Sequence, residues 1–126
     1  MGGRILIIDD NPINLKLASS VLESEGYAIV NAVDAEEAQE MLQHTMPDLI
    51  LMDIALPGMD GLTLTRKLKA DNRLKHVPVV ALTAFAMKGD DRKALEAGCE
   101  SYITKPIDTR KLPQLVAELL RKSQGE

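Results

Sequence analysis

Short apolar runs alternate with amphipathic stretches along most of the chain. The first run, Ile5-Leu6-Ile7-Ile8, is rich in β-branched residues and bounded by polar ones, which predicts a strand buried on both faces. Four further runs predict strands at 27–30, 48–52, 77–82 and 101–103. A helical spacing of apolar residues follows each run, over 11–25, from 34 to about 44, and over 62–68, 90–97 and 112–120.

Local signals indicate where several of these helices begin and end. Asn11 is placed to cap the first helix, and Gly26 to end it. Asp34 with Glu37 three residues later forms a capping box in front of the second helix. Pro113 falls inside the last helix, where it removes a hydrogen bond, so we expect that helix to start late or to kink.

Five strands that are each followed by a helix predict an α/β fold with a parallel sheet covered on both sides. There are too few units for a (β/α)₈ barrel, which leaves an open, doubly wound, flavodoxin-like (βα)₅ sheet. We expect one domain over residues 1–126, with its core at 4–121. Ligands of such sheets bind at the carboxyl ends of the strands.

Ionisable and hydroxyl side chains follow four of the five predicted strands. Asp9-Asp10 follow the first strand, Asp53 the third, Thr83 the fourth and Lys105 the fifth. Each taken alone is an ordinary turn or cap residue. The fold, however, brings them to one rim, where two carboxylates about 4 Å apart repel by about 4 kcal/mol at an effective dielectric of 20. Three clustered carboxylates therefore predict a bound cation.

The expected cation is a hard one. Carboxylates without His or Cys neighbours favour Mg²⁺, with Mn²⁺ as a substitute, and His44 and His76 are expected away from this rim as solvated structural residues. A divalent cation, an ammonium and a hydroxyl can together hold the oxygens of a phosphoryl group, and a carboxylate beside them can accept the group as a nucleophile.

Composition and charge exclude several other classes. A net charge of −4 and an aromatic complement of two Tyr and one Phe argue against direct nucleic-acid binding. Cys99 is the only cysteine, which excludes an intramolecular disulfide and a Cys-based zinc site. The absence of a long apolar run or a signal-peptide pattern favours a cytoplasmic protein without membrane contact.

The rim residues resemble the signature of response-regulator receiver domains, the CheY-like family, from about Arg4 to Leu120. The resemblance rests on four segments, namely Asp9-Asp10, Leu51-Met52-Asp53-Ile54-Ala55-Leu56-Pro57-Gly58-Met59-Asp60-Gly61, Thr83-Ala84 and Lys105-Pro106. It implies the strand order 2-1-3-4-5. Within the family, segments 83–90 and 98–103 look most like the stand-alone DivK-type regulators.

The resemblance also implies roles for the rim residues. Asp53 would accept a phosphoryl group from the phosphohistidine of a histidine kinase or histidine phosphotransfer protein. Asp10 and Asp53 would ligate Mg²⁺ directly and Asp9 through water, and Ala55 would contribute its carbonyl. The residues expected to contact the phosphoryl group are Thr83, Ala84 and Lys105.

A conformational switch and a cis peptide bond are further implications of the resemblance. Thr83 would move toward the phosphoryl group and Tyr102 would turn inward, which would change the surface of the fourth helix, fifth strand and fifth helix for a downstream signalling protein. An aromatic residue in a central strand is otherwise a core residue; the position of Tyr102 three residues before Lys105 favours the switch. The Lys105-Pro106 bond is expected to be cis.

A partner surface is expected beside the rim. Leu15, Pro106 and Ile107 are its candidate residues, and the alternative is a slightly wide core face on the first helix. The predicted apolar stripe of that helix has Ile13 and Leu15 at its two edges and consists of Asn14, Leu17, Ala18, Val21 and Leu22. The few residues after Leu120 leave no room for an output domain, so we expect action by docking, or origin in a hybrid kinase.

Ala55 and Phe85 lie two residues beyond Asp53 and Thr83, where the family varies. Because neither side chain can position a water, we expect a long-lived phosphoryl state and not a turnover enzyme. A flavodoxin-like electron carrier would need a Ser/Thr-rich loop after the first strand. A phosphatase with an aspartyl nucleophile would need a second Asp where Ala55 stands. The remaining alternative is an interaction module that keeps the receiver fold and signals without phosphorylation.

Overall fold

The computed structural model describes residues 3–83 and 90–123, and their strands form one parallel sheet. The sheet has five strands in the order β2-β1-β3-β4-β5, as expected. The strand bounds are β1 Arg4–Ile8, β2 Ala28–Ala32, β3 Leu49–Asp53, β4 Val79–Thr83 and β5 Ser101–Thr104. Asp53 and Thr83 are thus the last residues of their strands and not the first residues of the loops.

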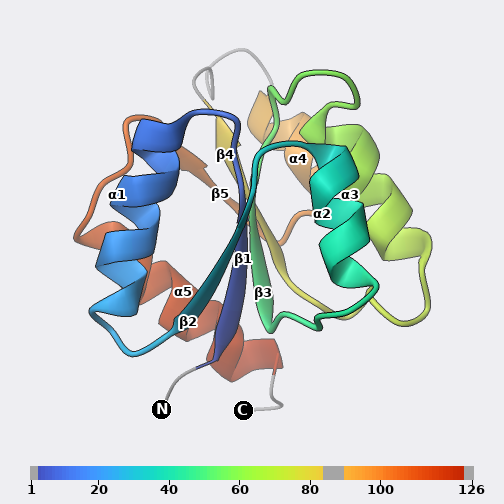
Figure 1. The fold of residues 1–126 in the computed structure, drawn as a ribbon. Coiled ribbons are helices and arrows are strands. Elements are labelled where there is room, and N and C mark those ends of the chain that lie inside the picture. The colour runs from blue at the N-terminus through green and yellow to red at the C-terminus, as the bar shows by residue number, and fades with distance from the viewer. Residues whose placement is uncertain (1–2, 84–89, 124–126) are drawn as a thin grey trace.

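The helices cover both faces of this sheet (Figure 1). Their bounds are α1 Pro12–Glu23, α2 Ala35–Leu42, α3 Gly61–Ala70, α4 Asp90–Ala97 and α5 Lys111–Ser123. Helices α1 and α5 pack on one face, and α2, α3 and α4 on the other, which is the doubly wound arrangement.

Alternate residues of the strands divide between two cores. Ile5 and Ile7 of β1 belong to the core under α1 and α5, whereas Leu6 and Ile8 belong to the core under α2, α3 and α4. Successive side chains of a strand point to opposite faces, so a strand covered on both sides needs apolar residues at every position. The continuous apolar runs in the sequence have this cause.

Polar side chains begin the first two helices as the sequence predicts. Asn11 Oδ1 accepts hydrogen bonds from the N–H groups of Ile13 and Asn14, at 2.8 and 3.4 Å. Asp34 Oδ1 accepts from the Glu37 N–H at 2.8 Å, and Glu37 Oε1 in turn accepts from the Val33 N–H at 2.9 Å.

The buried face of α1 differs from the predicted stripe. Leu15, Ala18 and Leu22 are buried, whereas Leu17 is 38% and Ile13 is 75% exposed. The helix packs against α5 as well as against the sheet, so its buried face is turned toward Leu15 and away from Leu17. Periodicity alone gave the width of the stripe but could not place its centre.

Pro113 does not delay the start of the last helix. Helix α5 begins at Lys111, so Pro113 lies in its first turn, where a missing N–H is tolerated. The start is stabilised by Asp108, whose Oδ1 accepts from the N–H of Arg110 at 2.9 Å and of Lys111 at 3.3 Å. These two bonds lower the pKa of the Asp108 carboxyl, because they favour its charged form.

Candidate functional site

Three carboxylates meet at the carboxyl ends of two neighbouring strands. Asp9 and Asp10 directly follow β1, Asp53 ends β3, and these strands pair with Ile8 opposite Met52. One oxygen from each of the three side chains lies within 4.8 Å of the others. Asp9 and Asp53 are buried, and Asp10 is exposed. The predicted convergence of the three carboxylates is confirmed.

The ammonium of Lys105 lies against two of these carboxylates. Its Nζ is 3.0 Å from Asp53 Oδ2 and 3.4 Å from Asp9 Oδ2. Lys105 follows β5, so its side chain reaches past β4 to β3. Thr83, buried at the end of β4, stands on the strand between them. The five residues predicted at the rim therefore lie at, or directly after, the carboxyl ends of four adjacent strands, β1, β3, β4 and β5.

Backbone N–H groups hold one oxygen of each buried carboxylate. The Asn11 N–H donates to Asp9 Oδ1 and the Ala55 N–H donates to Asp53 Oδ1, both at 2.9 Å. The second oxygen of Asp9, Oδ2, is buried and has no hydrogen bond within the described residues; its neighbour is the Lys105 ammonium at ion-pair distance. A buried carboxylate oxygen without a hydrogen bond is costly, and a cation would compensate it.

The residues present fit a hard divalent cation. All of the clustered side chains offer oxygen, and the exposed Asp10 leaves one side of the cluster open to solvent. Oxygen-only donors that leave room for water are the kind of site that Mg²⁺ occupies in proteins. Oδ2 of Asp9 accepts no hydrogen bond within the described residues, although Lys105 lies near it, and this is the observation that favours a further cation here.

Burial and neighbouring charges shift the pKa values of Asp9 and Lys105. Burial raises the pKa of the Asp9 carboxyl, and the nearby charge of Asp53 adds to this, against the opposing effects of the Asn11 N–H and of Lys105. Burial lowers the pKa of Lys105, but the hydrogen bond and charge of Asp53, with the charge of Asp9, outweigh it, so the net shift is upward. Lys105 therefore stays a cation, and burial works against the charged form of Asp9, which a bound metal would stabilise.

The positions of the expected switch and partner residues differ in part from the prediction. Tyr102 is on β5, which is an edge strand and not a central one, and the residue is 36% exposed. Leu15 and Ile107 are only 8% and 7% exposed and belong to one core, so their side chains are not a free surface; Pro106 is exposed. Leu15 is buried because α1 packs against α5 and the sheet, and Ile107, in the segment between β5 and α5, belongs to the same core. The Lys105-Pro106 bond is cis, as expected.

Two residues singled out in the sequence belong to the segment 84–89. Ala84, a candidate contact of the phosphoryl group, and Phe85 lie outside the described residues. Ala55, two residues after Asp53, is exposed. Gly61 belongs to the site although we assigned it no role from the sequence, because its backbone packs against the carbonyl of Asp53. Only its place in the motif after Asp60 gave a signal.

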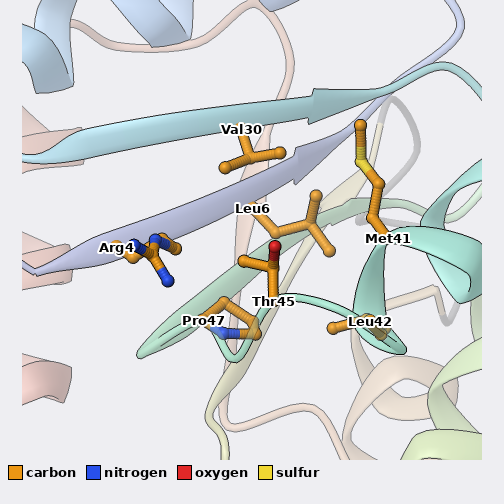
Figure 2. A pocket seen from close by; sticks show the side chains of 7 residues that line it. All are labelled: Arg4, Leu6, Val30, Met41, Leu42, Thr45 and Pro47. Carbon is orange, nitrogen blue, oxygen red and sulfur yellow. The ribbon is translucent and has the colours of Figure 1, made fainter.

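A separate, shallow pocket lies at the C-terminal end of α2 (Figure 2). Apolar side chains supply most of its wall, and none of the rim carboxylates belongs to it. Its lining residues are Arg4, Leu6, Val30, Met41, Leu42, Thr45 and Pro47. Because it offers neither a cluster of ionisable groups nor a nucleophile, the acidic rim is the stronger candidate for a functional site.

Comparisons with known proteins identify the family of the chain. A family model described as the response regulator receiver domain matches residues 5–117. The polar-differentiation response regulator DivK of Brucella anthropi is 42% identical over 116 residues, which cover 92% of this chain and 94% of DivK.

Two solved structures extend the comparison. The receiver domain of a signal transduction histidine kinase from Syntrophus aciditrophicus has a TM-score of 0.90 at 35% identity and covers 98% of this chain and 94% of that one. The receiver domain of the Pseudomonas aeruginosa sensor histidine kinase PA1611, which has a magnesium ion in its active-site cleft, has a TM-score of 0.88 at 34% identity. The match covers 96% of this chain and 99% of that one.

Within the described residues no helix is both long and apolar enough to cross a bilayer.

Proposed function

The chain belongs to the family of response regulator receiver domains, and we propose that it accepts a phosphoryl group on Asp53 from the phosphohistidine of a histidine kinase or histidine phosphotransfer protein. The observation that carries the proposal is the position of the Asp53 carboxylate, which is in contact with the Lys105 ammonium and within a cluster of three carboxylates. Its likeness to DivK supports the same function.

A divalent cation, Mg²⁺ with Mn²⁺ as a substitute, completes the proposed site. Asp9, Asp10, Asp53 and the carbonyl of Ala55 are the groups that hold it. When bound, the cation supplies positive charge beside the phosphoryl oxygens. The buried Oδ2 of Asp9, which has no hydrogen bond within the described residues, and the magnesium ion in the PA1611 domain support this part of the proposal.

The proposed transfer uses an Asp53 oxygen as the nucleophile. As this oxygen forms a bond to phosphorus, the P–N bond to the donor imidazole breaks, and the imidazole keeps the electron pair and takes up a proton. Lys105 stays protonated and balances the negative charge that accumulates on the phosphoryl oxygens. Thr83, at the end of β4, and Ala84, the next residue in the sequence, are the proposed hydrogen-bond donors to the phosphoryl group. The Ala55 N–H keeps the carboxylate in its orientation.

Loss of the phosphoryl group by hydrolysis is proposed to be slow. Ala55 is exposed beside Asp53 and has no group that can orient an attacking water. Phe85, outside the described residues, offers none either. The chain would then serve as a signalling domain whose phosphorylated state lasts, and not as an enzyme that turns over a free substrate.

The proposed output is a change of surface for a downstream signalling protein. Phosphorylation biases a two-state equilibrium when the two states contact the phosphoryl group differently. Thr83 at the end of β4 and the half-exposed Tyr102 on β5 are the proposed switch residues. Their strands are paired, with Ala81 opposite Tyr102.

The proposed place of action is the cytoplasm.

Incubation with acetyl phosphate and Mg²⁺, followed by intact-mass and peptide mass spectrometry, tests the proposal. We expect one added phosphoryl group, on Asp53, and none without Mg²⁺ or in Asp53→Asn. A panel of phosphorylated histidine donors then identifies the class of donor. An unmodified wild-type chain that still captures its partner would instead support an interaction module that signals without phosphorylation.

A further inference from the structure

The first residue of α3 packs directly on the peptide bond that follows the proposed phosphoacceptor. A Cβ atom built on Gly61 would lie 2.3 Å from the carbonyl oxygen of Asp53 and 2.7 Å from Cα of Ile54. The Gly61 N–H also donates a hydrogen bond to the carbonyl of Ile54 at 3.2 Å. Both contacts are with backbone atoms, which cannot move aside as the end of a flexible side chain can.

We propose that Gly61 and Thr65 are positioning residues for the Asp53 carboxylate. The inference rests on the proposed function, because it assumes that Asp53 is the reacting group. Neither residue contacts the carboxylate. They act through the backbone of residues 53–55, which α3 holds from one side.

Gly61 is required for its lack of volume and not for an unusual backbone angle. Gly58, three residues earlier in the same loop, has a positive φ of 72°, and a Cβ there would meet nothing within 4 Å. Gly61 has no positive φ, and an alanine there would overlap the backbone of Asp53 and Ile54. The two glycines thus separate a requirement for conformation from a requirement for close approach.

Thr65 holds the first turn of α3 in this place. Its hydroxyl is fully buried and donates to the carbonyl oxygen of Gly61 at 2.8 Å. The Cys99 thiol lies 3.9 Å from the Thr65 oxygen and donates to it. The hydroxyl thus connects the helix start that faces Asp53 to the buried segment before β5.

The other side of the same backbone is held by the sheet. The Ile54 N–H donates to the carbonyl of Leu82 in β4 at 3.2 Å, and the Ala55 N–H donates to Oδ1 of Asp53. The backbone of residues 53–55 is therefore held by β4 on one side and by α3 on the other, and this backbone sets the orientation of the Asp53 carboxylate. A displacement of about 1 Å can slow a positioned reaction about 100-fold, so small changes in α3 would be felt at the nucleophile.

Three variants test the inference, each measured at a temperature where it is fully folded. Gly61→Ala introduces the overlap, Thr65→Val removes the hydroxyl at nearly constant shape, and Thr65→Ser restores it. Gly58→Ala is the matched control in the same loop, and Leu68→Ala controls for lost stability because it removes a buried side chain from the far end of α3. Two quantities are followed: the Mg²⁺ dissociation constant by calorimetry, and the phosphorylation rate with acetyl phosphate at saturating Mg²⁺.

We expect Gly61→Ala to slow phosphorylation by about tenfold or more and to weaken Mg²⁺ binding. Thr65→Val should change both quantities in the same direction by a smaller factor, and Thr65→Ser should restore them. Both controls should stay within about twofold of wild type in both quantities, although both melt at a lower temperature, Gly58→Ala because of its positive φ and Leu68→Ala because of the cavity it leaves. If Gly61→Ala does not fold, the Thr65 pair decides the question.

Wild-type Mg²⁺ binding and phosphorylation in both Gly61→Ala and Thr65→Val would overturn the inference and leave these residues a purely structural role. If the wild-type chain takes no phosphoryl group from acetyl phosphate, the proposed function fails instead. The Mg²⁺ dissociation constants of the same variants then still show whether α3 positions Asp53.

Discussion

Lys105 Nζ lies 3.0 Å from Asp53 Oδ2, across the intervening strand β4. The same ammonium is 3.4 Å from Asp9 Oδ2. One cation is therefore shared by two buried carboxylates, with the exposed Asp10 close by. Without a metal the cluster carries more negative than positive charge, and the following predictions start from that imbalance.

Asp9→Asn should stabilise the metal-free protein. The Asp9 carboxylate is buried, and its Oδ2 has no hydrogen bond within the described residues, so a neutral amide of the same shape removes a desolvation penalty and a repulsion with Asp53. We expect a gain on the order of 1 kcal/mol in the free energy of unfolding, measured by urea denaturation in EDTA. Asp10→Asn, at an exposed position, is the control and should change it by less than about 0.5 kcal/mol. A loss of stability in Asp9→Asn would contradict the imbalance.

The stabilisation by Mg²⁺ should depend on pH. Because the pKa of Asp9 is raised in the folded state, its protonated form adds stability that is present below the ordinary pKa of 3.8 and is lost as pH rises through the folded pKa. Mg²⁺ competes with that proton. The increase in melting temperature on adding Mg²⁺ should therefore be largest near neutral pH and shrink as pH falls through the folded pKa of Asp9. Calorimetric melts with and without Mg²⁺ at several pH values measure this, and an increase that grows in acid would be the opposite of what we expect.

Lys105→Met should destabilise the metal-free protein by about 1–3 kcal/mol, because it leaves two buried carboxylates without their shared cation. The side chain of Lys105 is partly exposed, so the loss should be smaller than for a fully buried pair. Added Mg²⁺ should recover more stability in this variant than in wild type. A double-mutant cycle with Asp53→Asn, followed by urea denaturation, gives the coupling energy between the two residues. A coupling energy near zero would show that the contact at 3.0 Å contributes nothing to folding.

Lys69→Met should destabilise the fold by about 2–3 kcal/mol without changing the site. At the opposite end of the sheet, Lys69 Nζ donates to the carbonyl of Val77 at 2.7 Å and pairs with Glu100 at 3.1 Å. Glu100 also accepts from the Val79 N–H at the start of β4. Urea denaturation and Mg²⁺ calorimetry on the same variant separate the two effects. A changed Mg²⁺ affinity would mean that the two ends of the sheet are coupled.

Polar side chains at positions 55 and 85 should shorten the life of the phosphorylated state. Ala55 is exposed beside Asp53 and cannot orient a water, whereas Asn or Gln there can donate and accept hydrogen bonds. We expect Ala55→Asn combined with Phe85→Gln to speed loss of the phosphoryl group by about tenfold, followed by the decay of label on purified protein. An unchanged decay would exclude the apolar side chains as the cause of slow hydrolysis.

Much of the fold could be predicted because local and global preferences agree along this chain. A strand covered on both faces requires a continuous apolar run, and the first two helices carry their own start signals at Asn11 and Asp34. The site followed from the fold. Parallel strands place their carboxyl ends at one edge of the sheet. The proximity of Asp9, Asp53 and Lys105 could therefore be predicted although these residues are far apart in sequence.

The sequence by itself determined which residues form strands and helices and which ionisable groups share the rim, because these depend on residue type and on the order of elements. Only the tertiary structure decided that α1 buries Leu15 and turns Leu17 outward, that Tyr102 stands half exposed on an edge strand, and that Gly61 packs on the carbonyl of Asp53. Each of these depends on where two distant elements touch. Such contacts are set by the volume and direction of side chains from several elements at once, and no spacing within one segment records them.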